Sequence, residues 1–386
     1  MHPQLIQAML RQPQFPELLR KLPEPGQQLR VEGLPGSASA LLISALADAS
    51  PQRMWVVVTA GPNEADAAEA DLQSILGENS VVLYPQRETL PYEAAEHHFE
   101  VSGLRVEALE ALLAGRTRVL VTTARALQER AEIPTGLADL RLTLRTGDTI
   151  RPLELAERLD TMGFERSPLV EAVGEYAVRG GLIDLFGFGA PDPIRIEFWG
   201  DEVASIRHFD ILNQRSTQEL QQADILPVDI RPTASEMEHV RRSLLDVLSR
   251  DAVLVELESA HLEQEFERTW AQVLHLHGVE KKRGGTPEAP QMLFLMPEQA
   301  AANVASFARL TIRPHEGVAA QTVRFNARPA EPIERDIDKL NTLLRAGAVR
   351  GEETFILCDN AGQLDRLEEL IQLAKGAGIP PRTHLA

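Results

Sequence analysis

The segment MWVVVTA, residues 54–60, decides the fold class because it is an almost uninterrupted run of apolar and β-branched residues. Two similar runs follow it, SVVLYP at 80–85 and RVLVTT at 118–123. Such continuous runs are typical of parallel strands that are buried on both faces. The stretches between them, 64–76 and 101–115, have the composition and spacing of helices. Strands that alternate with helices predict an α/β lobe built on a parallel sheet.

A different pattern begins near residue 138. LRLTLRTGDTI at 140–150 alternates like a strand, and 151–164 has the spacing of an amphipathic helix. From 168 to 228 nearly every signal is β, with short runs bounded by Gly, Pro or Asp. This part of the chain therefore predicts a small α+β domain that is inserted into the lobe.

The lobe is expected to resume after the insertion, because residues 229–278 return to helices and one apolar strand. KKRGGTPEAPQ at 281–291 has the composition of a linker, and a helix, a strand at 353–359 and another helix follow it. A single strand–helix pair near the end suggests a piece of a larger protein. The predicted divisions are a lobe segment at 1–137, the inserted domain at 138–228, a segment completing the lobe at 229–280, the linker at 281–291 and a further small α/β domain at 292–386.

The overall composition excludes several classes of protein. The content of hydrophobic residues, 44%, and of charged residues, 25%, is that of a globular chain. A net charge of −18 repels a polyphosphate backbone and disfavours free-standing DNA binding. The single cysteine, Cys358, excludes a multi-thiolate metal site and an internal disulfide. Because neither a secretory signal nor an apolar run of membrane-spanning length is visible, we expect a cytoplasmic protein without structural metal.

A glycine-containing loop before residue 54 has the position of a nucleotide-binding loop. Gly33, Gly36 and Ser37 lie in it, but a working loop needs the pattern GxxxxGK[ST], and the chain has no lysine between Lys21 and Lys281. The acids at 256 and 258 that follow a later apolar strand are separated, and no Asp stands beside them. We therefore favour a plain helix start over a nucleotide site, and predict neither catalytic residues nor a cofactor.

The segment GEYAVRGGLIDLFGFGAPDPIRIEFWGDEVASIRHFD, residues 174–210, carries the most information about function. The two-residue period of a strand places Arg195, Glu197 and Trp199 on one face and the apolar residues between them on the other. Arginine and tryptophan are enriched in the residues that dominate protein interfaces. The alternative is that Trp199 is partly core and the arginines are solvated charges.

This segment closely resembles the second domain of UvrB and of the bacterial transcription-repair coupling factors, the Mfd family. YPQRETLPYEAAEHHFEVSGLRVEAL at 84–109 and VLVTTARALQER at 119–130 are also similar to that family. The resemblance covers most of residues 25–275 and is weak from about 290. It implies a degenerate RecA-like P-loop lobe (domains 1a and 1b), an inserted α+β domain like UvrB domain 2, and a small α/β domain similar to domain 3.

The choice between the two relatives depends on what the chain lacks. UvrB carries an intact P-loop and a tyrosine-rich hairpin that probes DNA damage. This chain contains only three tyrosines, and its 91–101 interval is too short and too poor in aromatic residues for such a hairpin. The missing lysine and the eroded acids match the Mfd side, where this module is catalytically silent.

The resemblance implies an adaptor that recruits UvrA, whereas RNA polymerase and DNA are contacted by motor domains outside this chain. Within the family, the UvrA contact uses the arginine of a motif that here reads AVRG, and an arginine and an aromatic residue of the strand 194–199. The positions that match are Arg179, Arg195 and Trp199, with less certain roles for Phe198, Asp201 and Phe209. The family usually has Phe where this chain has Trp199.

Two other functions compete with this interpretation. One is an active helicase-like ATPase, and the other is a UvrB-like protein that binds damaged DNA directly. On the adaptor interpretation, Arg179→Ala or Arg195→Ala abolishes capture of UvrA and leaves the melting temperature nearly unchanged.

Overall fold

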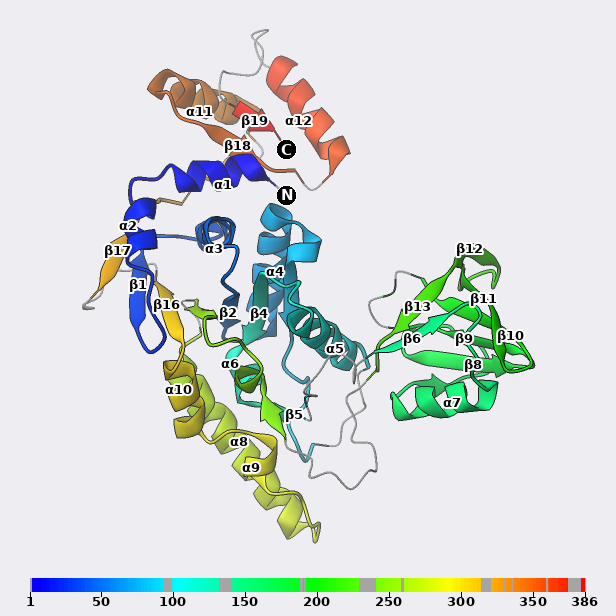
Figure 1. The fold of residues 1–386 in the computed structure, drawn as a ribbon. Coiled ribbons are helices and arrows are strands. Elements are labelled where there is room, and N and C mark those ends of the chain that lie inside the picture. Colours follow the sequence, from blue (N-terminus) through cyan, green and yellow to red (C-terminus); the bar gives the residue numbers. More distant parts are fainter. Residues whose placement is uncertain are drawn as a thin grey trace. The chain divides into compact units, whose positions relative to one another are not determined.

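The structure is a computed structural model, and it divides into two compact units, Met1–Ala327 and Arg328–Ala386. We describe each unit by itself (Figure 1). The residues that the structure describes are 2–93, 99–131, 133, 141–187, 190, 192–228, 241–257, 260–313, 321–329, 331–334, 336–358, 360–373 and 383–385.

The first unit contains a parallel sheet, as the apolar runs predict. Among the described residues this sheet has seven strands in the order β17-β1-β16-β15-β2-β4-β3, and every neighbouring pair is parallel. The strands are β1 (Gln28–Glu32), β2 (Trp55–Thr59), β3 (Val81–Tyr84), β4 (Val119–Thr123), β15 (Val253–Glu256), β16 (Ala308–Arg313) and β17 (Thr322–Arg324). The predicted α/β fold class is confirmed.

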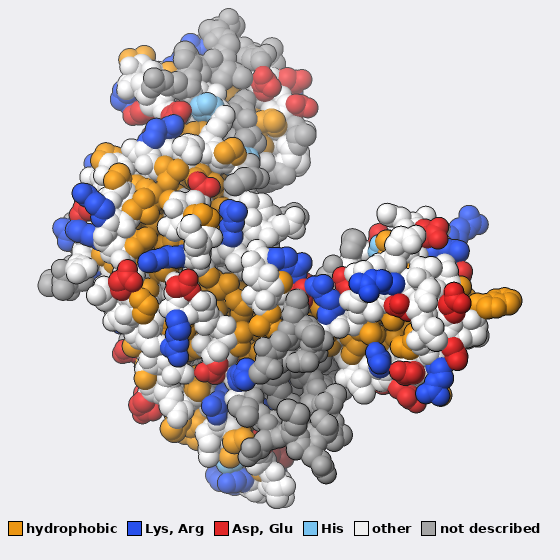
Figure 2. All heavy atoms as spheres, viewed as in Figure 1, with side chains coloured by type: hydrophobic (Ala, Val, Ile, Leu, Met, Phe, Trp, Pro, Cys, Tyr) orange, Lys and Arg blue, Asp and Glu red, His pale blue; other side chains and the backbone are white. Residues whose placement is uncertain are grey.

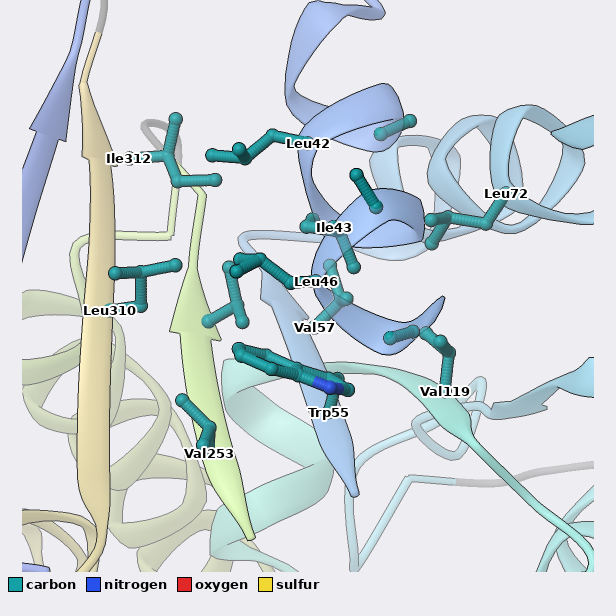
Figure 3. Close-up of a cluster of buried hydrophobic side chains, with 14 of the residues drawn as sticks. Leu42, Ile43, Leu46, Trp55, Val57, Leu72, Val119, Val253, Leu310 and Ile312 are labelled. Carbon is teal, nitrogen blue, oxygen red and sulfur yellow. The ribbon is translucent and has the colours of Figure 1, made fainter. Parts of the chain in front are cut away.

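Helices cover both faces of this sheet, which explains why its strands β2, β3, β4 and β15 are apolar at nearly every position. Alternate residues of β2 enter different cores: Trp55 and Val57 pack with α3, and Val56 and Val58 pack on the opposite face. In Figure 3, Leu42, Ile43 and Leu46 of α3 lie against the first of these faces. The helices of the lobe are α1 (Pro3–Leu10), α2 (Phe15–Arg20), α3 (Ala38–Ala49), α4 (Pro62–Leu76), α5 (Phe99–Leu113), α6 (Ala124–Gln128), α8 (Leu262–Lys282), α9 (Pro290–Leu293) and α10 (Pro297–Ala305).

The end of the lobe differs from the prediction. β16 lies between β1 and β15, and β17 adds the edge next to β1, so residues 292–327 complete the lobe instead of belonging to the last domain. The predicted linker at 281–291 is also shorter, because α8 extends through Lys282 and α9 begins at Pro290. The physical reason is the alternation in ARLTIR, where Leu310 and Ile312 are buried against the neighbouring strands and α3.

The inserted domain, residues 142–228, has its own sheet and core. Six strands run in the order β12-β11-β10-β9-β8-β7, and β6 pairs with β13. Helix α7 (Pro152–Thr161) packs along one face of the six-stranded sheet (Figure 1), where Leu155, Ala156 and Leu159 join the core. The strands are β6 (Leu142–Arg145), β7 (Glu165–Arg166), β8 (Glu175–Arg179), β9 (Leu182–Leu185), β10 (Ile194–Trp199), β11 (Glu202–Phe209), β12 (Ser216–Leu220) and β13 (Gln222–Ile225).

Two smaller features complete the fold. Short strands β5 (Arg130–Ala131) and β14 (Arg242–Ser243) pair with each other in the first unit. The second unit contains α11 (Ile337–Arg350), β18 (Thr354–Ile356), α12 (Ala361–Leu373) and β19 (Thr383–Leu385), with β18 and β19 parallel and Leu340, Leu344 and Ile371 buried. Among the described residues, no helix has both the length and the apolar character needed to span a membrane.

Candidate partner-binding site

The six-stranded sheet of the inserted domain has one face covered by α7, and no helix among the described residues of this domain covers the other face. We call the second the outer face; it carries Arg179, Asp184, Arg195, Glu197 and Arg207. In β10, Ile194 and Ile196 are buried against α7, and Phe198 packs at the border of the same core. The alternation found in the sequence therefore holds for this strand.

A cluster of three charged residues lies at the centre of the outer face. Asp184 is fully buried, and Arg195 donates to it from Nε at 2.7 Å and from Nη2 at 2.9 Å. Arg179 donates to the same carboxylate from Nη2. The register explains this proximity, since Asp184 of β9 lies directly opposite Arg195 of β10. One carboxylate thus holds two guanidinium groups, and the cluster keeps a net positive charge.

The two arginines differ in what they can offer a partner. The side chain of Arg195 is only 14% exposed, whereas that of Arg179 is 40% exposed. Hydrogen bonding to Asp184 raises the pKa of Arg195 above its ordinary value, and its Nη1 also donates to the carbonyl of Gln214 at 3.1 Å. Arg195 therefore acts within the domain, and Arg179 is the arginine that a partner can reach.

Phe209 packs against the guanidinium group of Arg195 in this cluster. Its ring lies 4.9 Å from the Arg195 guanidinium carbon and is 1% exposed, in a small apolar group with Val170 and Ala177. An arginine over an aromatic face is a favourable contact. Phe209 and Phe198 are therefore packing residues, which separates them from the exposed members of the predicted set.

Trp199 and Asp201 lie at the tip of the β10–β11 hairpin. Trp199 is 84% exposed and pairs with Glu202 across the turn Gly200–Asp201, and the backbone carbonyl of Asp201 accepts from Ile150 at 2.8 Å. The neighbouring β8–β9 hairpin turns at Gly180–Gly181, where Gly180 has a φ of +59°. Glycines suit these tight turns, which end the strands beside Arg179 and Trp199.

Asp184 is the residue that sequence reasoning missed. The run LIDLF reads as an apolar strand with a single acid in it, and the acid takes the opposite face from Ile183 and Leu185. A lone carboxylate at such a position needs a cationic partner. That requirement was the available signal, because Arg179 and Arg195 were already singled out.

The loop that resembles a nucleotide site has a structural role. Gly33 has a φ of +80°, and a Cβ on it would collide with the carbonyl oxygen of Phe325, so its backbone packs directly on the neighbouring segment. Ser37 precedes α3 but its side chain makes no capping hydrogen bond. Glu256 pairs with Arg313 at 2.7 Å, whereas residue 258 lies outside the described residues.

A cavity of about 530 Å³ lies beside this loop. Apolar side chains form most of its wall, including Ala40, Ile43 and Leu257, together with the acids Glu64 and Asp71. None of the described residues that line it is Lys or Arg. His261 and Ser39 also line it. Elsewhere in the described part of the chain, no group of three or more His, Cys, Asp or Glu residues could hold a metal ion.

The visible surface of the inserted domain mixes charges of both signs. Figure 2 shows Arg side chains interspersed with Asp and Glu side chains over this domain. On the outer face, Arg207 likewise pairs with Glu197 at 3.3 Å, and Glu197 also accepts from Ser205 at 2.8 Å. A mixed surface of this kind suits a folded protein partner better than a polyphosphate.

Comparisons with known proteins match the same region. Residues 142–245 match the family model of the UvrB interaction domain. The chain is 32% identical over 241 residues to a transcription-repair-coupling factor of Bacillus subtilis, covering 61% of this chain and 20% of that protein. The corresponding values are 35% over 223 residues for Mycobacterium bovis, with 56% and 18% covered, and 29% over 241 residues for Escherichia coli, with 62% and 20% covered.

The chain thus spans about a fifth of the length of these curated relatives. Within that fifth, the matched domain contains the Arg179–Asp184–Arg195 cluster and both hairpins of the outer face. Residues 142–245 are therefore similar to the UvrB interaction domain, and over more than half of its length the chain is similar to transcription-repair-coupling factors, which confirms the resemblance found in its sequence.

Proposed function

We propose that this chain is a non-catalytic adaptor of transcription-coupled nucleotide excision repair, which binds UvrA through the outer face of its inserted domain. In the complete protein, this adaptor belongs to an ATP-dependent translocase that displaces stalled RNA polymerase. Domains outside this chain contact the polymerase and DNA. Because that work takes place on the bacterial chromosome, we assign it to the cytoplasm.

The observation that carries the proposal is that the outer face presents an exposed arginine, Arg179, and that an exposed tryptophan, Trp199, lies at the tip of a hairpin of the same sheet. Arg179 is fixed to buried Asp184 through Nη2, and within the described residues its other guanidinium nitrogens make no hydrogen bond. They can bind a carboxylate of UvrA, and Trp199 offers a large apolar contact near the turn. Arginine and tryptophan are the residue types that dominate binding energy at interfaces.

The parallel-sheet lobe serves as a scaffold in this proposal. Its glycine loop packs on Phe325, and the described wall of the adjacent cavity contains apolar side chains, the acids Glu64 and Asp71, Ser39 and His261, but no Lys or Arg. Phosphoryl transfer needs positive charge at the phosphates and acids that hold magnesium. These features support an inactive lobe over the helicase-like alternative.

Two measurements test the proposal together. Isothermal titration of the purified chain with full-length UvrA should give saturable binding, and ATP hydrolysis by the chain, with or without duplex DNA, should stay at the level of a protein-free control. Absence of UvrA binding contradicts the adaptor function. DNA-stimulated hydrolysis supports the helicase-like alternative instead.

A further inference from the structure

The loop between β11 and β12, residues 210–215, exposes a leucine on a well-fixed backbone. Leu212 is 95% exposed. Asp210 Oδ1 accepts hydrogen bonds from the backbone N–H groups of Leu212 at 2.8 Å and Asn213 at 3.0 Å. The backbone N–H of Gln214 donates to the carbonyl of Asp210 at 2.7 Å. Local hydrogen bonds therefore determine where Leu212 is presented.

Gln214 joins this loop to the charged cluster of the outer face. Its carbonyl accepts from Arg195 Nη1 at 3.1 Å, and its side-chain amide donates to the carbonyls of Ile211 at 2.8 Å and Val170 at 3.4 Å. Its φ of +59° is uncommon for a residue other than glycine, and these contacts offset the cost of that conformation. The network that holds Arg179 thus also holds the loop of Leu212.

An exposed leucine by itself implies no function, since isolated apolar side chains are ordinary on protein surfaces. Leu212 differs in its fixed loop and in its direct connection to the cluster. Leu153 provides the contrast: it is 69% exposed, but it belongs to α7, which covers the opposite face of the sheet. Both leucines lie in the inserted domain. Leu153 belongs to the helix that covers one face of the sheet, whereas the loop of Leu212 is hydrogen-bonded to the cluster on the outer face.

We propose that Leu212 is a second apolar contact for UvrA, so that the binding surface extends from Trp199 across the Arg179 cluster to the β11–β12 loop. This inference rests on the proposed function. The occupant is the same partner because the loop is hydrogen-bonded to the cluster that holds Arg179. A loop that is already ordered loses little conformational entropy on binding. UvrA would accordingly offer an apolar recess to Leu212 and a carboxylate to Arg179.

Titration of full-length UvrA into four purified chains tests this inference: the wild type, Leu212→Asn, Leu212→Met and Leu153→Asn. Leu212→Asn should weaken binding about tenfold, because a polar amide replaces a leucine that the complex would bury. Leu212→Met keeps an apolar side chain and should stay within about threefold of the wild type. Leu153→Asn should bind like the wild type.

The outcomes separate this inference from the proposed function. If the wild-type chain does not bind UvrA, the proposed function fails. If the wild type binds and Arg179→Ala weakens it, but Leu212→Asn binds normally, only the role of Leu212 is overturned. An equal loss in Leu153→Asn also overturns it, because the effect would not depend on the face. Circular dichroism should show that all variants are folded, since both leucines are exposed.

Discussion

Arg195 forms a two-point ion pair with Asp184, and the carboxylate that receives both hydrogen bonds is fully buried. A carboxylate in such a position depends on its cations, because a buried charge without a partner is costly. The pair therefore contributes to the stability of the inserted domain as well as to the shape of the outer face. Arg179, which shares this carboxylate, is the more exposed of the two arginines.

Arg195→Ala should destabilise the protein, contrary to the expectation drawn from the sequence. Asp184 would keep only Arg179, and the ring of Phe209 would lose its cationic neighbour. We expect the free energy of unfolding to fall by about 2–4 kcal/mol, measured by urea denaturation. Arg207→Ala breaks a half-exposed pair with Glu197 and should cost less than about 1 kcal/mol. Equal losses in the two variants would contradict this assignment.

Arg179→Ala and Trp199→Ala should each weaken binding to UvrA without unfolding the domain. Each removes an exposed contact, and truncating such a contact at an interface costs roughly 1–3 kcal/mol, which corresponds to about 5- to 150-fold in affinity. Arg158→Ala is the matched control, because Arg158 is exposed on α7 and pairs with Glu154. Titration calorimetry should give wild-type affinity for this control, and a comparable loss there would point away from the outer face.

Gly33→Ala and Gly36→Ala should differ in their effect on stability, although both glycines have positive φ. The backbone conformation alone costs about 1–2 kcal/mol for alanine at either position. At Gly33 the added Cβ would also collide with the carbonyl of Phe325, whereas no atom of the described residues lies within 4 Å of the corresponding position at Gly36. Thermal denaturation should therefore show a clearly larger fall in melting temperature for Gly33→Ala. Similar melting temperatures would mean that the segment around Phe325 moves readily to make room for the added Cβ.

Tyr176 should make the stability of the protein sensitive to alkaline pH. Burial, with a hydrogen bond donated to Asp160 at 2.7 Å, raises the pKa of Tyr176 to about 12, above the ordinary value of 10. The folded protein thus retains this proton more strongly than the unfolded chain, so the stabilisation is complete below pH 10 and is lost as the pH rises toward 12. Denaturation at several pH values should show a steeper loss for the wild type than for Tyr176→Phe. Parallel curves would rule out this contribution.

Much of the fold could be predicted because the order of apolar and polar residues in a strand shows which of its faces are buried. The run around Val56 and Val57 is apolar at every position, and both sides of β2 are covered by helices. Residues 308–313, which contain Leu310, were placed in the last domain and were not predicted as a strand. The chain reaches them only after the long helix α8, and local pattern does not reveal which sheet a strand joins.

For the candidate site, the sequence predicts which residues to consider but not what each of them contacts. The sequence identified Arg179, Arg195 and Trp199, yet it gave no measure of exposure, and only the register between β9 and β10 reveals that Arg195 is committed to Asp184. Phe209 was grouped with the contact residues although it is buried. Leu212 was overlooked because a leucine in a turn looks like any other loop residue until its exposure is known.

Because β16 lies in the middle of the seven-stranded sheet, the inserted domain can fold before the lobe while the chain is being synthesised. The six-stranded sheet uses only residues 165–220, a continuous stretch that can assemble soon after it emerges. The larger sheet needs residue 308 onward before β1 and β15 acquire their common neighbour. During synthesis, the inserted domain can therefore fold while the seven-stranded sheet still lacks β16.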